Sequence, residues 1–161
     1  AHPDPFHIAL DGRRLLAAQA RPLRVRGLEG ATEPPAQTLL RAWRRWGRDG
    51  LDRIHGDFLL IEWDSDRRRL LVARAPLSEF NIFVLADGRG VRFATLAPAL
   101  GARAPNLPFF ATQFSGQPGY GWSDTGFAGV EAVAPGALTT FGHSGTEVRP
   151  FWSPGDDNGP A

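Results

Sequence analysis

Apolar residues gather in two short runs near the middle of the chain, Phe58 to Trp63 and Leu70 to Ala73. A polar tip, Asp64 to Arg68, separates the two runs. Runs of this length around a turn-forming tip predict a β-hairpin, and their nearly continuous apolar character predicts that both faces of the hairpin are largely buried.

Ahead of this hairpin the apolar spacing changes to that of a helix. Leu39, Leu40, Trp43 and Trp46 recur at helical spacing, while the arginines between them turn to another face. Two prolines at 34–35 suit the start of a helix, and a glycine at 47 suits its end. The pattern therefore predicts a helix over residues 36–46, followed by a short second helix over residues 49–54.

The rest of the chain predicts short strands, short helices and glycine-rich connections. Strands are expected at 6–10, 23–25, 81–86 and 91–94, and a last hairpin at 137–141 and 146–152. Helical turns are expected at 96–100 and 107–114, with a glycine-rich loop over 115–126. Hairpins combined with amphipathic helices indicate an α+β fold with helices packed on sheet faces. We expect one domain over residues 1–154 and a linker or tail over residues 155–161.

Composition narrows the class of protein. The 161 residues are 42% hydrophobic and 22% charged, which is ordinary for a soluble globular chain. Neither a membrane-spanning run nor a signal peptide is recognisable, so a cytoplasmic location is expected. The chain has no cysteine, which excludes a disulfide framework, a thiolate metal site and a thiol nucleophile within it. It also has no methionine, so we expect a processed chain or a piece of a longer one.

Three ordered sequence blocks carry a family resemblance. The first is the helix ending in Trp46-Gly47 together with the hairpin and Ala73-Arg74; the second is Phe93 to Leu100. The third runs from Phe127-Ala128-Gly129-Val130 through Pro135-Gly136 to Phe151-Trp152-Ser153-Pro154. In this order the blocks resemble the amino-terminal, class II glutamine amidotransferase half of asparagine synthetases. The resemblance implies the four-layer αββα sandwich of amino-terminal-nucleophile (Ntn) hydrolases, in which two antiparallel sheets stack between helices.

The chemistry of that family is largely missing from this chain. The family's glutaminase uses an amino-terminal cysteine as nucleophile and its own α-amine as base, whereas this chain begins with Ala1. The turn that holds the substrate's ammonium in the family aligns with residues 34–37, where prolines replace the acid. The family's Asn-Gly-Glu loop has only poor counterparts, at 27–29 or at 11–13. We therefore predict no catalytic and no glutamine-binding residue here.

The resemblance also implies a partner. Family members carry an ATP-using synthetase domain after this half, and its pyrophosphate loop does not occur in this chain; the nearest string, Ser115 to Tyr120, lacks the required residues. ATP and Mg²⁺ are thus implied for a parent synthetase and no cofactor for this chain. Relatives that have lost glutaminase include β-lactam synthetases and lasso peptide cyclases, and the eroded glutamine site is most similar to the cyclases.

Few other side chains suggest a site. The four histidines have no partner at ligand spacing, so no metal site is predicted, and His55 is expected to be a half-buried neighbour of the hairpin. Arginines and tryptophans alternate in residues 41–48, but near-zero net charge favours an amphipathic helix over nucleic-acid binding. Aromatic residues on the glycine-rich loop and near the end of the chain are candidate contacts with a partner or substrate: Tyr120, Trp122, Phe151 and Trp152.

Three functional hypotheses follow. The first is a non-catalytic glutaminase-like scaffold for an ATP-dependent amide ligase, with a lasso peptide cyclase as the favoured parent and a precursor peptide as a further partner. The second is an active glutamine amidotransferase whose amino-terminal cysteine was removed or replaced. The third is a stand-alone binding module that uses the arginine and tryptophan face. None of the three requires a membrane.

Overall fold

A computed structural model describes residues 6–87, 90–116, 121, 123–143 and 145–153. The chain forms two compact units. The first contains residues 1–79 and 135–161, and the second contains residues 80–134. Each unit has its own antiparallel sheet, so the fold is α+β, as the sequence predicts.

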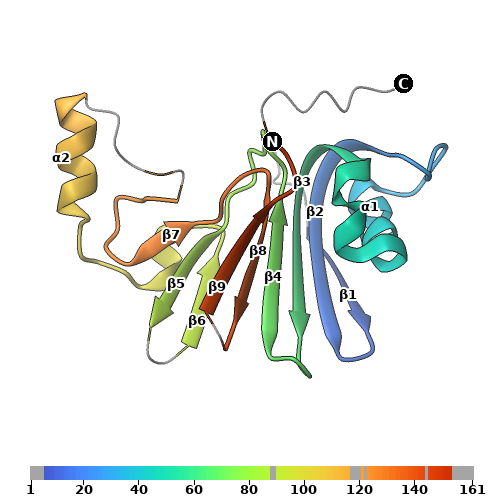
Figure 1. The fold of residues 1–161 in the computed structure, drawn as a ribbon, viewed down its shortest axis with the longest axis horizontal. Helices are drawn as coiled ribbons and strands as arrows, with labels where there is room; N and C mark the ends of the chain where they lie inside the picture. The colour runs from blue at the N-terminus through green and yellow to red at the C-terminus, as the bar shows by residue number, and fades with distance from the viewer. Residues whose placement is uncertain (1–5, 88–89, 117–120, 122, 144, 154–161) are drawn as a thin grey trace. The chain divides into compact units, whose positions relative to one another are not determined.

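A six-stranded sheet with two helical segments makes up the first unit (Figure 1). Its strand order is β1-β2-β3-β4-β8-β9, and every neighbouring pair is antiparallel. The strands are β1 (His7–Asp11), β2 (Arg14–Val25), β3 (Ile54–Asp64), β4 (Arg69–Arg74), β8 (Ala137–Gly142) and β9 (Gly145–Pro150). Helix α1 (Pro35–Trp46) and the 3₁₀ helix η1 (Gly47–Arg53) lie between β2 and β3 in the chain.

Helix α1 packs on one face of this sheet, mainly against β2. Its apolar stripe buries Leu39, Leu40 and Trp43 against strand residues such as Leu16 and Phe58. The exposed arginines of the helix lie on the opposite side, which is the arrangement that the spacing predicts. Trp46 is only half-buried, and the guanidinium groups of Arg45 and Arg53 lie over its ring.

The β3–β4 hairpin is enclosed on both faces. Leu60 pairs with Ala73 on the α1 side, and Ile61 pairs with Val72 on the other side. All four residues are buried, which confirms the expectation from their apolar runs. The burial of both faces explains why the hairpin sequence lacks the alternation that a half-exposed strand would show.

Strand β2 is much longer than the three-residue strand that the sequence predicts. It runs for 12 residues, and its pairing with β3 shifts register between Ala20 and Leu23, at Pro22. The segment from Arg14 to Ala20 is rich in alanine, which has a low preference for strands, and proline interrupts the pattern. Pairing with β1 on one side and β3 on the other overrides those local preferences.

The second unit contains a three-stranded sheet in the order β6-β5-β7, with two helical segments. Its elements are β5 (Phe83–Asp87), β6 (Gly90–Ala94), the 3₁₀ helix η2 (Ala97–Leu100), helix α2 (Leu107–Ser115) and β7 (Val130–Ala132). Ala97, Leu100 and Val130 form its small core with half-buried neighbours such as Phe83 and Phe127. The Thr125 hydroxyl donates to the Val130 carbonyl oxygen at 2.7 Å and ties the preceding loop to β7.

Two smaller predictions need correction, and one observed strand has no counterpart among the predictions. The expected helix at 49–54 is a 3₁₀ helix ending at Arg53, and Ile54 already begins β3. The strand expected to reach residue 152 ends at Pro150, because Phe151 turns back to donate its N–H to the Gly136 carbonyl at 2.9 Å. Strand β7 was not predicted, since three residues are too few to show a period.

Candidate functional site

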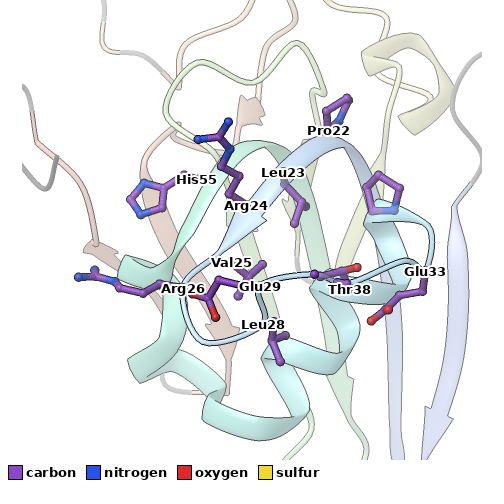
Figure 2. Close-up of a pocket in the computed structure, with 13 residues that line it drawn as sticks. Pro22, Leu23, Arg24, Val25, Arg26, Leu28, Glu29, Glu33, Thr38 and His55 are labelled. Atoms are coloured by element: carbon purple, nitrogen blue, oxygen red, sulfur yellow. The ribbon is translucent and has the colours of Figure 1, made fainter. Parts of the chain in front are cut away.

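A pocket of the first unit lies where β2 ends and α1 begins. Its volume is about 970 Å³, and its walls are the end of β2, the loop that follows, the first turns of α1 and His55 of β3 (Figure 2). Val25 and Leu28 lie near the centre of the view, with Arg24, Arg26 and His55 on one side and Glu33 on the other. The floor is thus apolar and the rim is charged.

Close backbone packing shapes this pocket. Gly56 of β3 has a φ of +136°, and a Cβ atom there would lie 2.8 Å from the Pro22 carbonyl oxygen. Only glycine lets β3 pass the β2 irregularity so closely. Gly27 has a φ of +88° and lies against the Trp46 ring, so the loop turns directly over the end of α1.

Both acidic side chains on the rim already have partners. The Glu29 carboxylate accepts a hydrogen bond from the Gly27 N–H at 2.7 Å, and this bond holds the pKa of Glu29 below its ordinary value. Glu33 forms an ion pair with Arg41 at 2.9 Å. The Glu29 carboxylate therefore stabilises the loop, and the Glu33 carboxylate contacts the helix. An ammonium group that bound to either carboxylate would have to displace these contacts.

The first turn of α1 contributes no carboxylate to this pocket, and Glu33, which comes just before Pro34, is paired with Arg41. Pro34 is the residue before the helix, its first turn contains no acid, and no side chain caps it. Of the two weak counterparts of the family's Asn-Gly-Glu loop, Gly27-Leu28-Glu29 lies in the pocket wall. The other, Asp11-Gly12-Arg13, is the tight turn between β1 and β2 and carries ion pairs to Arg14 and Asp66. Of the two counterparts, Gly27-Leu28-Glu29 therefore lies beside the start of α1, and Asp11-Gly12-Arg13 does not line this pocket.

A polar network occupies the segment after β4. The Arg74 guanidinium donates to the Ser78 carbonyl oxygen at 3.0 Å, and the Ser78 hydroxyl donates to Asp57 at 2.5 Å. Arg21 forms ion pairs with both Asp57 and Glu79. Burial lowers the pKa of Arg74, although the nearby Asp57 carboxylate opposes that shift. This network links β2, β3 and the turn after β4.

The candidate contact residues fall into two groups. Phe151 is half-buried, because its ring stacks on Phe58 with 6.2 Å between centroids, and Trp152 is 38% exposed and lies against Gly136. Phe151 also lines a smaller groove of about 350 Å³ together with Arg48 and Arg149. Tyr120 and Trp122 lie outside the described residues.

The histidines differ from expectation at one position. His55 is exposed, not half-buried, because it pairs with the exposed Arg24 on the face of β3 that points away from α1, whereas the preceding residue, Ile54, points toward α1 and is buried. Nothing in the sequence distinguishes this histidine as a pocket residue. Within the described part of the chain, no cluster of three or more His, Asp or Glu side chains could hold a metal ion, and no helix is long and apolar enough to cross a membrane.

The two antiparallel sheets with their two α-helices define an α+β domain of the kind found in Ntn-type amidotransferases. The solved glutamine phosphoribosylpyrophosphate amidotransferase of B. subtilis superposes on 95% of this chain with a TM-score of 0.52 and 13% identity, and this chain covers 32% of it. A structure described as the allosteric regulatory enzyme of purine biosynthesis superposes on 90% with a TM-score of 0.50 and 12% identity, and 30% of it is covered.

Sequence comparison assigns the family. Residues 18–152 match the model of the glutamine amidotransferase domain, and the chain belongs to this family. Asparagine synthetase [glutamine-hydrolyzing] 3 of Bacillus subtilis (strain 168) is 28% identical over 140 residues. That match covers 81% of this chain but 22% of the relative, so the chain spans about a fifth of that protein's length.

Proposed function

We propose that this chain is a glutaminase-like domain without glutaminase activity that serves as a scaffold for an ATP-dependent amide ligase. The observation that carries the proposal is the simultaneous lack of a thiol and of a substrate clamp in a domain of this family. The chain contains no cysteine, and the helix that would hold the ammonium of glutamine starts with Pro34 and has no acid in its first turn. Amide hydrolysis in this family uses a thiolate as nucleophile, and a carboxylate holds the ammonium of the substrate.

The ligase is the partner that relatives of this chain suggest. The B. subtilis relative is named as an asparagine synthetase, and more than three quarters of it lies outside the matched part. We infer a parent of the lasso peptide cyclase type, in which ATP activates a carboxylate and an amine of the same peptide closes the ring, so that ammonia is not needed. ATP and Mg²⁺ then belong to the synthetase domain, and a precursor peptide is its substrate. We also infer that the two sheets stack as an αββα sandwich.

The test of lost glutaminase activity restores the missing nucleophile. The chain with Ala1→Cys at a free amino terminus is incubated with glutamine, and ammonia release is measured, with the B. subtilis relative as positive control. We expect no release above that of the unaltered chain, because the clamp is missing as well. Glutamine-dependent ammonia release from this variant would favour the alternative, an active amidotransferase that lacks only its cysteine.

The ligase is tested with the full-length polypeptide. We expect it to cleave ATP in the presence of a precursor peptide and to produce a peptide whose mass is lower by one water, as macrolactam formation requires. Glutamine should neither accelerate this reaction nor be consumed. Formation of asparagine from aspartate, with glutamine or free ammonia as nitrogen source, would instead place the parent among the asparagine synthetases.

A further inference from the structure

A groove beside the 3₁₀ helix η1 has no role in the proposed function. Its volume is about 350 Å³, which suits a small organic molecule, and every residue that lines it belongs to the first unit. Its apolar part consists of Leu51 of η1, Leu138 of β8 and Phe151, which follows β9. Leu51 and Leu138 belong to the core that α1 covers, so the groove lies on the α1 side of the sheet. The αββα sandwich inferred above joins the sheets on their other faces and would leave this side open.

Two arginines from different elements line this groove. Arg48 belongs to η1, and Arg149 belongs to β9, where it pairs with Leu138 and therefore points to the same side of the sheet. The Nη2 atom of Arg48 is buried and has no hydrogen-bond partner among the described residues. Leaving a buried donor of a charged group unpaired costs free energy, so native proteins satisfy such donors with another group, water or a ligand.

A third arginine adds positive charge near Arg48. Arg69 of β4 is half-buried, its Nε atom has no hydrogen-bond partner in the described part of the chain, and it lies 4.0 Å from the Asp64 carboxylate. Burial lowers the pKa of Arg69, and the charges of Arg48 and Arg67 lower it further, while Asp64 and Glu62 oppose the shift. Because like charges repel, an anion bound at Arg48 would stabilise this group of arginines.

Two acids in the same groove restrict the charge of a ligand. Asp49 and Asp52 of η1 also line the groove, and both are exposed. A dianion such as phosphate would be attracted by the arginines but strongly repelled by these aspartates. A carboxylate carries a single charge, and its two oxygens match the paired N–H groups of a guanidinium. The apolar part of the groove favours a carboxylate with an apolar substituent.

We propose that this groove binds a small carboxylate, with its oxygens on Arg48 and Arg149 and its apolar substituent against Leu138 and Phe151. A free carboxylic acid and the C-terminal residue of a peptide both present this chemistry. The proposal goes beyond the proposed function and does not depend on it, because the groove shares no residue with the pocket beside α1.

Titrations followed by NMR of backbone and arginine side-chain N–H groups test the ligand class. Isovalerate represents a free acid, N-acetylleucine represents a peptide C-terminus, and isovaleramide is the uncharged control for isovalerate. We expect a Kd on the order of 1 mM for the tighter carboxylate, with shifts at Arg48 and Arg149, and binding of isovaleramide weaker by about tenfold than that of isovalerate. The tighter of the two carboxylates identifies the source of the ligand.

Three results would overturn the proposal. One is equal affinity for isovalerate and isovaleramide, which would mean that the groove recognises no charge. Another is tighter binding of inorganic phosphate at the same ionic strength, and the last is the lack of any saturable shift in the groove with either carboxylate. These comparisons use the unaltered chain and therefore do not depend on whether a variant folds.

A substitution then tests the role of the arginine. Arg48→Gln should raise the Kd of the tighter carboxylate about tenfold, because it removes the charge and the unpaired Nη2 donor. Arg44→Gln is the matched control, since it removes one charge from an exposed position of α1 outside the groove and should leave the Kd unchanged. Circular dichroism verifies that both variants are folded. Equal Kd values for the two folded variants would show that Arg48 does not hold the ligand.

Discussion

At the scale of single residues, one buried hydrogen bond joins α1 to the sheet. The indole N–H of Trp43 donates to the Glu62 carboxylate at 2.6 Å, and both residues are buried. Arg14 lies 3.8 Å from the same carboxylate and is more exposed. Trp43 thus contributes buried apolar area and is also the closest hydrogen-bond partner of the buried Glu62. A purely apolar side chain in its place would leave Glu62 without this hydrogen bond.

Trp43→Phe should therefore destabilise the chain by about 2 kcal/mol, since it removes a hydrogen bond to a charged group and leaves the acid with fewer partners. Urea unfolding followed by circular dichroism measures this change. Trp63→Phe is the matched control, because Trp63 is 39% exposed, and it should cost less than about 1 kcal/mol. Equal losses for the two variants would show that the hydrogen bond adds nothing.

Asp64, at the beginning of the hairpin tip, makes the stability depend on pH. The Arg67 N–H, at 3.0 Å, lowers the pKa of Asp64, and the Arg67 charge and the Asp66 N–H act in the same direction, while burial opposes them. Because the pKa is lower in the folded state, the charged carboxylate stabilises the fold above the ordinary aspartate pKa of about 4, and this contribution is lost as the pH falls toward the lowered value.

Asp64→Asn should accordingly flatten the decline of stability between neutral pH and pH values below about 4. The measurement is the free energy of unfolding in urea at a series of pH values for both proteins. The two curves should converge as the pH falls, since protonated aspartate and asparagine are both uncharged. Curves that stay parallel over this range would contradict the assignment to Asp64.

At the scale of elements, the pairing of β3 with the irregular part of β2 depends on one glycine. A Cβ atom at Gly56 would lie within 2.9 Å of Pro22 and Leu23 atoms, two of them in the backbone, and the φ of +136° is unfavourable for any other residue. The same paired segment of β2 and β3 forms one wall of the pocket beside α1. Strand pairing and pocket shape therefore have a common origin.

Gly56→Ala should destabilise the first unit by roughly 2–4 kcal/mol, because it combines backbone strain with a clash that backbone atoms cannot relieve cheaply. Thermal and urea unfolding provide the measurement. Gly142→Ala, on β8, is the control: nothing lies within 4 Å of its added Cβ atom, and its effect should stay within about 1 kcal/mol in either direction. A tolerated Gly56→Ala would mean that β2 and β3 approach less closely than described.

At the scale of the whole molecule, the proposed scaffold role depends on two features in different parts of the chain. The chain contains no cysteine, and the first turn of α1 contains no acid. Because the proposal takes the substrate clamp to be missing as well as the thiol, Ala1→Cys alone should not produce ammonia release from glutamine.

What the sequence by itself determined is local or compositional. The period of Leu39, Leu40 and Trp43 is repeated within a few residues, so it defines α1 and its buried stripe without knowledge of the remaining chain. The same is true of the β3–β4 hairpin, and the absence of cysteine is visible directly. The ordered blocks also sufficed to indicate the glutamine amidotransferase family, which the family model then confirmed.

Only the tertiary structure decided which distant segments meet. The length of β2 follows from partners on both of its sides, and the exposure of His55 follows from its place on the face of β3 that points away from α1. The pairing of Leu15 with both Leu10 and Trp63 likewise cannot be recognised in the sequence, because the three residues come from three strands. Strand pairing and burial depend on how the chain returns to itself, whereas periodicity depends only on near neighbours.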